Sequence, residues 1–494
     1  MRAAGMSVKV TFLYPDFFQY DEERYLPEGR IYLGIASLSA FLKKEGHNTS
    51  LIHLVAPPGR DELTRRIREE APDVIAVSTT SHMFPHVRQW IEWIKEDKDI
   101  FTICGGAHPT IDPEGTMAEA RLDAICLGEG EEALAELCDK LERDQDPSGI
   151  PSLWVRRGEQ VKRNPVRPLI EDLDSLPLPD RSIFDTALFC AQQHERGTLM
   201  ASRGCPYSCT YCSNHVQRSI YPNRKKYVRF RSVDNVMREI REIIAEDDEG
   251  RLRYIRFDDD ILTIDRDWFK DLTSRYNKEI DLPFICNSRV NLLDEETVKL
   301  FAEAGCSVIC MGIESGNEAL RKEVLRRNMA DGDIIKAFRL CRHYGIKTVS
   351  TNMVSLPGED LPALIDTIKL NARARPNCMQ VSTYHPYPNT ILYQLCEEKG
   401  YLSKRHVDTI FDGRSALDSP CFREPAYAFT KEKFYPLSEL FSRFYEAGRL
   451  GGVAVRIADY FLNDSRMPWL LRRPLLQKAC AWADAHSRFE WIYY

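Results

Sequence analysis

Strand-like apolar segments alternate with amphipathic helical segments in two stretches of the chain, and this alternation limits the possible folds more than any other feature. In the first stretch, residues 8–142, five strands are expected, at 8–14, 49–54, 73–79, 101–106 and 123–128. Parallel strands need helical crossovers and are buried on both faces, so this pattern predicts a doubly wound parallel sheet. Ligands of such sheets bind at the carboxyl ends of the strands.

The alternation starts again near residue 197. Six strands are expected there, at 197–204, 254–260, 283–289, 307–315, 347–356 and 378–387. Six β/α units exceed a typical open half-sheet and fall short of the roughly eight units of a closed barrel. The sequence therefore predicts an α/β protein whose second part is a partial, TIM-like (β/α)6 barrel, with its chemistry at the carboxyl ends of the strands.

Four regions follow from these patterns. We expect a Rossmann-like domain at 1–145, a proline-rich linker at 146–196, the partial barrel at 197–395 and a helical domain at 396–494. The last region is rich in aromatic residues, among them Trp469, Trp482, Phe489, Trp491, Tyr493 and Tyr494. These side chains are expected either to line a pocket for an apolar molecule or to form core.

Composition excludes several classes of protein. A net charge of −7 argues against a dedicated nucleic-acid binder, and 494 residues with 43% hydrophobic content are enough for several domains. The first residues lack the apolar core of a secretion signal, and no apolar run is long enough to span a bilayer. Scattered cysteines without such a signal favour a reducing compartment over a disulfide framework. We therefore expect a cytoplasmic protein.

One group of cysteines has the spacing of metal ligands. The segment RGCPYSCTYCSNH, residues 203–215, places Cys205, Cys209 and Cys212 in the pattern C-x3-C-x2-C. Proline and polar residues between them indicate a loop, which argues against three core cysteines. With His215 as a fourth ligand the set could hold zinc. With three cysteines alone it could hold an iron–sulfur cluster whose open iron binds and activates a substrate.

The cysteine pattern, with Tyr211 just before its last cysteine, resembles the signature of the radical S-adenosylmethionine (SAM) enzymes. Together with the six β/α units, the resemblance covers roughly residues 195–395. It implies that the three cysteines hold a [4Fe–4S] cluster whose open iron chelates SAM, with Tyr211 close to that cofactor. It also implies that an electron from the cluster cleaves SAM to a 5′-deoxyadenosyl radical, which abstracts a hydrogen from the substrate.

Polar motifs at the other strand ends resemble the SAM-binding motifs of the same family. FDDD resembles its F-x-D-D, which implies that Asp259 and Asp260 face the methionine ammonium, a suitable partner for a carboxylate. NSR implies that Arg289, helped by Asn287, meets the SAM carboxylate. A structural ion pair is the alternative for Arg289, and an acidic turn is the alternative for Asp258.

Two more motifs complete the set. GIES implies that Glu314 lies near the ribose hydroxyls or in a supporting ion pair. SLPGED resembles the family's G-x-P-G-E turn, which implies that Ser355, Pro357 and Gly358 shape the wall near adenine. Ser355 stands where the family usually has glycine, and this departure weakens the expected contact at that position.

The first alternating stretch resembles the cobalamin-binding domain of cobalamin-dependent radical SAM enzymes. The matching turns contain Thr79, Thr80, Ser81, Gly105, Gly106, His108, Pro109, Thr110, Gly128, Glu129 and Gly130. Glycines in these turns allow the backbone to approach a large flat corrin. The first loop, residues 15–30, has no histidine to ligate cobalt from below, so the resemblance implies base-off cobalamin. Ordinary turn histidines are the alternative for His82 and His108.

The leading hypothesis is a cobalamin-dependent C-methyltransferase acting on an unactivated carbon of a small-molecule or lipid-like substrate. The first alternative is a cobalamin-dependent radical SAM cyclase or oxidative enzyme without methyl transfer. A non-catalytic metal-binding module is a lower alternative. The family implies a flavodoxin or ferredoxin as electron donor, and the cofactors carry the chemistry, so no catalytic side chain is assigned. The basic segment 221–231 is interpreted as solvated surface or an anion contact. RNA modification is the alternative for this segment, and no nucleic-acid partner is expected.

Overall fold

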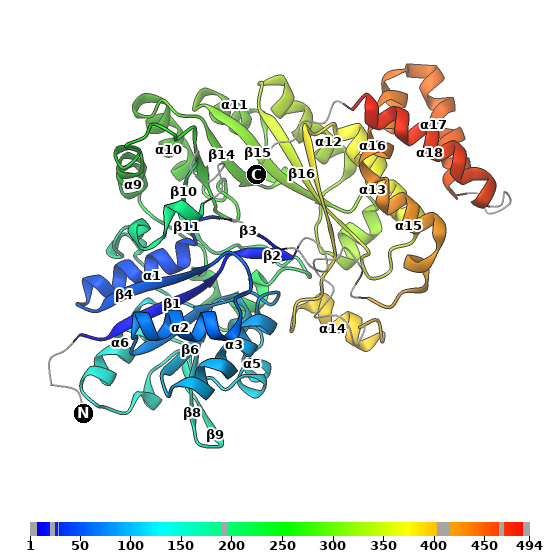
Figure 1. Ribbon diagram of the computed structural model, residues 1–494. Helices are drawn as coiled ribbons and strands as arrows, with labels where there is room; N and C mark the ends of the chain where they lie inside the picture. The colour runs from blue at the N-terminus through cyan, green and yellow to red at the C-terminus, as the bar shows by residue number, and fades with distance from the viewer. Residues whose placement is uncertain are drawn as a thin grey trace. The chain divides into compact units, whose positions relative to one another are not determined.

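The structure is a computed structural model (Figure 1), and its contacts divide the chain into two compact units. The first unit comprises Met1–Ser208, Cys212–Leu252 and Tyr387–Thr390, and the second comprises Cys209–Tyr211, Arg253–Pro386 and Ile391–Tyr494. The structure describes residues 7–19, 25–27, 29–189, 196–402, 415, 417–463 and 469–487. The aromatic residues expected at 489–494 lie outside this part of the chain.

A seven-stranded sheet forms the centre of the first unit, with the strand order β4-β1-β5-β6-β7-β8-β9. Its first five strands pair in parallel and match the expected ones: β1 (Lys9–Pro15), β4 (Asn48–Leu54), β5 (Val74–Ser78), β6 (Phe101–Gly105) and β7 (Ala124–Cys126). The connecting helices are α1 (Leu33–Lys44), α2 (Arg60–Glu70), α3 (Phe84–Asp97), α4 (Ala107–Ile111), α5 (Pro113–Glu119) and α6 (Glu131–Glu142). Helices cover both faces, so the predicted doubly wound sheet is confirmed (Figure 1).

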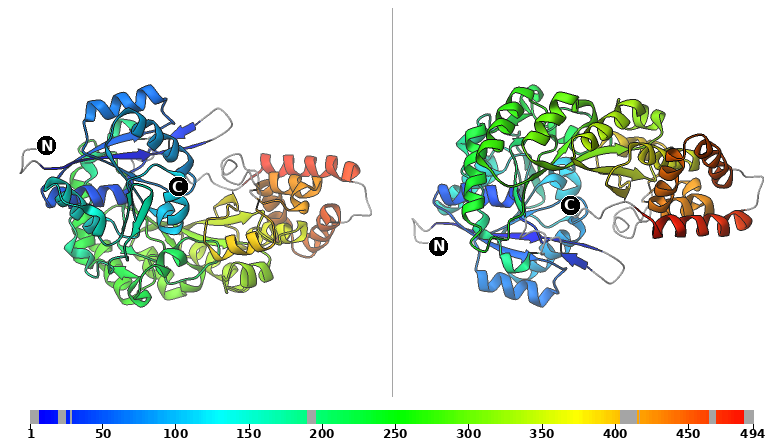
Figure 2. Two further views of the ribbon diagram at one scale, coloured as in Figure 1. Left: turned by 90° about the horizontal axis from the view of Figure 1, so that it is seen from below. Right: turned by 90° about the horizontal axis from the view of Figure 1, so that it is seen from above.

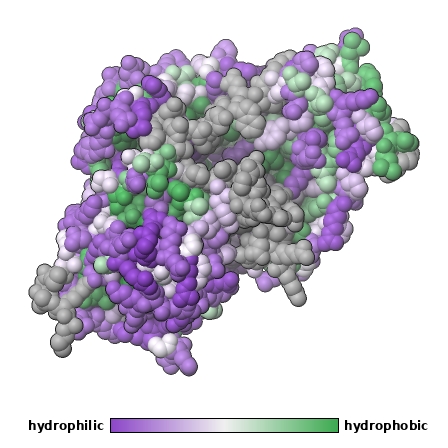
Figure 3. Space-filling model, viewed as in Figure 1, coloured by the Kyte–Doolittle hydropathy of each residue, from purple (hydrophilic) through white to green (hydrophobic). Residues whose placement is uncertain are grey.

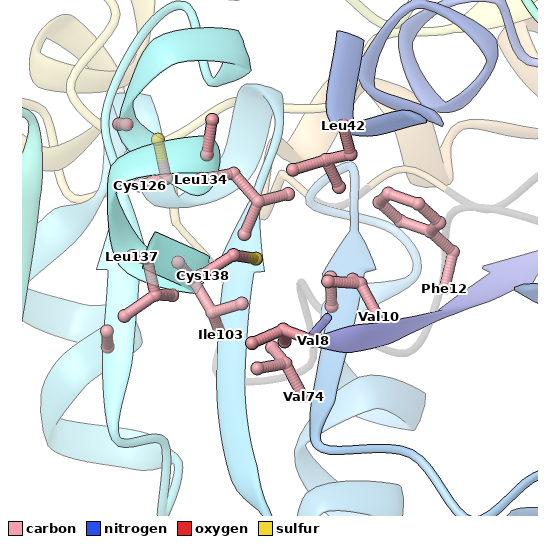
Figure 4. Close-up of a cluster of buried hydrophobic side chains, with 14 of the residues drawn as sticks. Val8, Val10, Phe12, Leu42, Val74, Ile103, Cys126, Leu134, Leu137 and Cys138 are labelled. Carbon is pink, nitrogen blue, oxygen red and sulfur yellow. The ribbon is translucent and has the colours of Figure 1, made fainter. Parts of the chain in front are cut away.

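The core of this unit lies between the sheet and the helices α1 and α6 (Figure 4). Strand β1 contributes Val10 and Phe12, two residues apart, and α6 contributes Leu134 and Cys138, four residues apart. These spacings are the periods of a strand and of a helix face. Burial raises the pKa of the Cys138 thiol to about 12, so this cysteine behaves as a small apolar side chain.

The first sheet continues beyond residue 145, where the sequence analysis places the start of the linker. Strands β8 (Leu153–Arg157) and β9 (Gln160–Arg163) extend the sheet in antiparallel fashion from β7. They form a hairpin through Gly158, whose φ of 60° suits a tight turn. Residues 164–189 of the expected linker have 3-10 turns and no strand, and the last residue of that region, Arg196, begins the next strand.

The second sheet has six strands in sequential order, β10-β13-β14-β15-β16-β17. Their bounds are β10 (Arg196–Leu199), β13 (Tyr254–Phe257), β14 (Phe284–Ser288), β15 (Cys306–Glu314), β16 (Lys347–Val354) and β17 (Cys378–Thr383). The pairs from β13 to β17 are parallel, which agrees with the predicted (β/α)6 partial barrel. Among them lie α9 (Val233–Ala245), α10 (Arg266–Glu279), α11 (Glu295–Glu303), α12 (Asp331–His343) and α13 (Leu361–Ala374).

Capping side chains start several of these helices. Asp265, Asp294 and Asp360 each accept a hydrogen bond from the backbone N–H three residues later, at the beginning of α10, α11 and α13. Each of these helices is preceded by a loop that follows the carboxyl end of a strand. The capping bonds fix the start of the helix and therefore hold the end of that loop in a defined conformation.

The C-terminal part of the second unit is helical, as expected. It contains α14 (Ile391–Glu398), α15 (Pro425–Glu432), α16 (Phe434–Glu446), α17 (Gly448–Asn463) and α18 (Trp469–Ala485). Helices α15 to α18 share one apolar core with α13, to which Leu364, Tyr427, Phe441 and Leu476 contribute. In both views of Figure 2 the orange and red helices of this segment lie together.

Candidate functional site

The cysteine segment is a loop, as its sequence predicts. It follows the short strand β11 (Ser202–Arg203), which pairs with β12 (Arg229–Phe230), and it precedes α8 (Asn214–Ser219). The turn begins at Gly204, whose φ is 92° and where an added Cβ would lie 2.5 Å from the carbonyl oxygen of Tyr227. Arg218 closes the first half of the loop by donating to the Cys205 carbonyl at 3.3 Å and to Ser208 Oγ at 2.6 Å.

The middle of the loop is held by backbone contacts within the second unit. Thr210 donates its N–H to the Leu325 carbonyl at 3.2 Å and its hydroxyl to the Val324 carbonyl at 2.5 Å, and it accepts from the N–H of Leu392. These bonds fix Cys209, which is buried, in front of two guanidinium groups. Arg289 Nη1 lies 3.5 Å and Arg327 Nη1 3.7 Å from its Sγ. Two cations beside one sulfur complement a thiolate-held cluster.

The donor set in this loop is three free thiols, and its chemistry suits an iron–sulfur cluster. Cys205, Cys209 and Cys212 are free thiols, with Cys205 and Cys212 half-buried. No group of three or more His, Cys, Asp or Glu side chains in the described part of the chain could hold one metal ion, and this includes the set with His215. Zinc needs its ligands to meet at one point. A cubane bonds each cysteine to a different iron, so its ligands are more widely spaced.

Arg327 is the centre of a buried network that the sequence did not reveal. Besides Cys209, it donates to the Gly312 carbonyl at 2.7 Å and to the Tyr211 hydroxyl at 3.1 Å. It also lies 3.8 Å from a carboxylate oxygen of Glu314. The network therefore joins the cysteine loop to the carboxyl end of β15.

Glu314 ends β15 in a left-handed backbone conformation, with a φ of 67°. Its carboxylate passes over Gly312, where an added Cβ would lie 2.1 Å from Glu314 Oε1, and it accepts from Thr351 Oγ1 at 3.4 Å. Burial raises the pKa of this carboxyl group, while Arg327 and Tyr211 oppose the rise. The ion pair with Arg327 is present, and the place of Glu314 near the ribose hydroxyls stays a prediction.

The motifs after β13 and β14 lie beside each other. Asn287 on β14 donates its side-chain amide to the Asp259 carbonyl at 2.9 Å. The Asp259 side chain is buried, whereas Asp260 is exposed. Asp258 pairs with Arg256 at 3.0 Å, in agreement with an acidic turn. Arg289 is buried and donates to Asn291 Oδ1 at 2.8 Å as well as to Cys209.

The turn after β16 explains why glycine is usual at the position of Ser355. Ser355 has a φ of 63°, a conformation that favours glycine, and Gly358 follows with a φ of 81°. Glu359 Oε2 holds the turn by accepting from the Ser355 N–H at 2.5 Å and from the Tyr427 hydroxyl at 2.6 Å. Tyr427 belongs to α15, so the helical C-terminal segment supports this turn directly. Burial raises the pKa of Glu359 to about 7.

In the first unit, the three predicted turns, two of which contain glycine, meet at the carboxyl edge of the sheet. The Thr79 N–H donates to the Gly105 carbonyl at 3.0 Å, and the His108 N–H donates to the Thr79 carbonyl at 3.1 Å. Thr110 Oγ1 accepts from the Gly128 N–H at 3.1 Å. Gly106 is needed by this packing, because an added Cβ would lie 2.9 Å from Ser78 and Thr79 atoms.

Two histidines lie in these turns. His108 Nδ1 contacts Ser81 Oγ at 3.1 Å, and His82 Nε2 contacts the Tyr387 hydroxyl at 3.0 Å. Burial lowers the pKa of each to about 4, so both imidazoles are neutral at neutral pH. His108 Nε2 is buried without a hydrogen-bond partner in the described part of the chain. An orphaned polar atom at this edge suits a bound polar cofactor.

The Gly128–Glu129 turn is engaged within the protein. Gly128 leaves room for the Tyr221 hydroxyl, which would lie 2.1 Å from an added Cβ and which accepts from the Glu129 N–H at 3.0 Å. The Glu129 carboxylate pairs with Arg203 at 2.8 Å and with Arg229 at 2.9 Å. This turn therefore anchors the strands next to the cysteine loop, a role that the sequence did not suggest for Glu129.

Two family models match the chain. The B12 binding domain matches residues 31–138, and the radical SAM superfamily matches residues 199–370. An uncharacterized methyltransferase of Pyrococcus horikoshii is 29% identical, with 73% of this chain and 77% of the relative covered. The anaerobic magnesium-protoporphyrin IX monomethyl ester cyclase of Rubrivivax gelatinosus is 25% identical, with 74% of this chain and 66% of the relative covered.

A solved structure has the same fold. The cobalamin-dependent SAM radical enzyme OxsB with aqua-cobalamin bound matches with a TM-score of 0.69 and 19% identity, covering 96% of this chain and 75% of that chain. The fold, the cysteine loop and the two matching domains define a radical SAM enzyme. The chain combines a B12-binding domain with a radical SAM domain, which is the domain combination of the cobalamin-dependent radical SAM enzymes. These domains imply a [4Fe–4S] cluster, SAM and cobalamin as cofactors.

Proposed function

We propose that this enzyme is a cobalamin-dependent methyltransferase that acts on an unactivated carbon of a small-molecule or lipid-like substrate. The observation that carries the proposal is the combination, in one chain, of a B12-binding domain with Cys209 held against Arg289 and Arg327. The methyltransferase of Pyrococcus horikoshii, similar over most of the chain, supports methyl transfer as the outcome.

When bound, the cluster and SAM supply the 5′-deoxyadenosyl radical and methylcobalamin supplies the methyl group. In the proposal Cys205, Cys209 and Cys212 hold the cluster. Asp259 and Asp260, placed after β13, attract the methionine ammonium of SAM, whose carboxylate Arg289 meets.

The remaining residues hold this site in shape. Arg327 keeps Tyr211 and Glu314 in place, and the Glu359–Tyr427 bond holds the turn at Ser355 that faces adenine. The joined turns around His108 in the first unit would hold cobalamin, with a polar group of the cofactor satisfying His108 Nε2. The first loop, residues 15–30, contains no histidine, and the base-off state that this implies stays part of the proposal.

Labelled SAM tests methyl transfer. The anaerobically reconstituted protein would be supplied with hydroxocobalamin, which carries no methyl group, a flavodoxin or ferredoxin type reductant and SAM bearing a deuterated methyl group. The proposal expects iron and cobalt in the protein and the deuterated methyl group on a carbon of a compound from a cell extract, detected by mass spectrometry. Product without label would refute methyl transfer.

Ring formation or oxidation without methyl transfer is the second candidate, favoured by the similarity to a cyclase. It predicts 5′-deoxyadenosine and a product two hydrogens lighter than its substrate, with no deuterium gained. A non-catalytic metal-binding module predicts neither product, and a preparation that contains zinc and no iron would support it.

A nucleic-acid substrate is disfavoured by the pairing of the basic segment 221–231. Arg229 is buried against Glu129, Arg231 is buried against Glu239, and Lys226 pairs with Glu171 at 2.6 Å. Of the two sequence interpretations of this segment, solvated surface or an anion contact, Arg229 and Arg231 follow the second, because each contacts a carboxylate. Charges neutralised within the protein are not available for phosphates.

A further inference from the structure

The outward face of α17 is apolar. Leu450, Val453, Ile457 and Tyr460 are all exposed, Leu450 to 80%. Their spacing of three and four residues places them in one stripe along the helix. The buried residues of the same helix are Gly451, Ala458 and Leu462, which lie on the opposite side. This is the reverse of an ordinary surface helix, whose outward face is polar.

Helix α18 repeats the arrangement. Its buried residues Leu476, Cys480 and Ala483 belong to the core shared with α16. Its outward side carries Leu470, Leu471, Leu475 and Trp482, with exposures of 80%, 64%, 55% and 48%. We call these four residues and the four of the α17 stripe the α17–α18 surface. Figure 3 shows hydrophobic residues at the end of the molecule where these two helices lie.

Cations accompany this surface. The exposed charged residues of the two helices are Arg449, Arg456, Arg473, Lys478 and Asp484. None of the four cations makes an ion pair with another described residue of the chain. On α17, Arg449 and Arg456 each lie one residue before a member of the apolar stripe. A local excess of positive charge in a chain of net charge −7 needs an explanation.

We propose that the α17–α18 surface binds the surface of a membrane that contains anionic lipids. Leucine and isoleucine side chains on one side of two helices, with arginine and lysine next to them, are typical of helices that lie in the interface of a bilayer. The cations would reach the lipid phosphates while their stems lie along the apolar residues. Tyr460 and Trp482 have the amphipathic rings that suit the interface.

Spanning the bilayer is not required by this proposal. In the described part of the chain, no helix is both long enough and apolar enough to cross a membrane. Both α17 and α18 keep one face in the protein core, so only their outward faces are available to lipid.

A second copy of the chain fits this surface less well than a bilayer. A two-fold interface brings the same patch of each copy together, so the four unpaired cations would face their own equivalents. Like charges held close together repel. A bilayer with anionic lipids offers apolar chains and negative phosphates side by side, which is the complement of the observed surface. If the substrate is lipid-like, as the proposed function has it, the same contact would bring the barrel to that substrate. Only this consequence rests on the proposed function.

Vesicle sedimentation tests the surface without any cofactor. The full-length protein would be mixed with vesicles of phosphatidylcholine alone or of an equal mixture with phosphatidylglycerol. We expect wild-type protein to sediment with the mixed vesicles and to be released by added salt. In the variant R456Q/R473Q/K478Q, the partition coefficient should fall about 100-fold, because each cation near an anionic surface contributes about fivefold.

The apolar side chains need their own variant. In L471E/L475E the partition coefficient should fall by at least roughly tenfold, because leucine side chains no longer enter the lipid. The matched control is Ile244→Glu, since Ile244 on α9 is also an exposed apolar residue, at 37%, and lies in the first unit. This variant should bind like wild type. Circular dichroism would confirm that all variants are folded.

Several results would overturn the proposal. It fails if wild-type protein sediments with neither kind of vesicle, or if L471E/L475E binds as wild type does. It also fails if sedimentation equilibrium shows a dimer that L471E/L475E converts to a monomer, because the surface would then join two copies. Failure of methyl transfer in the labelling experiment would leave vesicle binding unchanged, so the two proposals can be told apart.

Discussion

The Glu359→Gln substitution should remove a pH dependence of stability that this buried carboxyl group causes. Glu359 is 1% exposed, and its Oε1 is buried without a hydrogen-bond partner in the described part of the chain. Its Oε2 accepts from Ser355, Leu356 and Tyr427. Burial raises the pKa from 4.5 to about 7 despite these bonds. Glutamine keeps the shape of the side chain and cannot ionise.

The sign follows from proton binding. An acid with a higher pKa in the folded protein holds its proton more tightly there, so folding is favoured at low pH and this stability is lost as pH rises from about 4.5 to about 7. The difference between these two pKa values corresponds to about 3 kcal/mol. Relative to wild type, Glu359→Gln should therefore gain about 3 kcal/mol in free energy of unfolding between about pH 5 and about pH 8.

Urea unfolding of both proteins, followed by circular dichroism at the two pH values, measures this difference. Other titrating groups are common to both proteins, so their contributions cancel when variant and wild type are compared. A gain of the expected sign supports a carboxyl group that is protonated in the folded protein at mildly acidic pH. The reasoning would be refuted if the difference in free energy of unfolding between variant and wild type were the same at both pH values. It would also be refuted if the variant lost stability relative to wild type at the higher pH.

Other substitutions test the remaining contacts. Ser355→Val should lower the free energy of unfolding by about 2 kcal/mol in urea unfolding, because a branched side chain is strained at positive φ, whereas Ser355→Gly should not. Arg327→Lys should keep the iron content but slow 5′-deoxyadenosine formation roughly 100-fold, because a bidentate donor is lost; an unchanged rate would argue against its role. Glu129→Gln should destabilise the protein by about 3 kcal/mol in urea unfolding, since Arg203 and Arg229 lose a buried partner.

Much of the fold could be predicted because its signals are local. The strands β1, β5 and β15 are continuous apolar runs, and each is followed by a turn with glycine or polar residues. The hairpin β8–β9 was missed because its residues are largely polar and are followed by prolines, which resemble a linker. Its partner strand, β7, gives it a place in the sheet that its own sequence does not indicate.

The candidate site was predictable where a residue lies in a strand-end motif, and unpredictable where a residue reaches the site across the fold. Arg327 contacts Cys209 from 118 positions away along the chain, and Tyr427 contacts Glu359 from 68 positions away. Neither lies at the end of a strand. Ser355 is an intermediate case, because its place in the turn was predicted and its positive φ explains why glycine is usual there. Its contact with the C-terminal helices was not predicted.

Electron paramagnetic resonance tests the central claim, a [4Fe–4S] cluster at the cysteine loop with an iron open to SAM. The protein would be reconstituted anaerobically, reduced with dithionite and measured with and without SAM, alongside Cys209→Ala and the matched control Cys310→Ala. Cys310 is a buried core cysteine of β15. We predict that wild type and Cys310→Ala give a reduced-cluster signal and that this signal changes when SAM is added. Cys209→Ala should not give this signal. A protein without the cluster signal, or a signal that SAM leaves unchanged, would contradict the account.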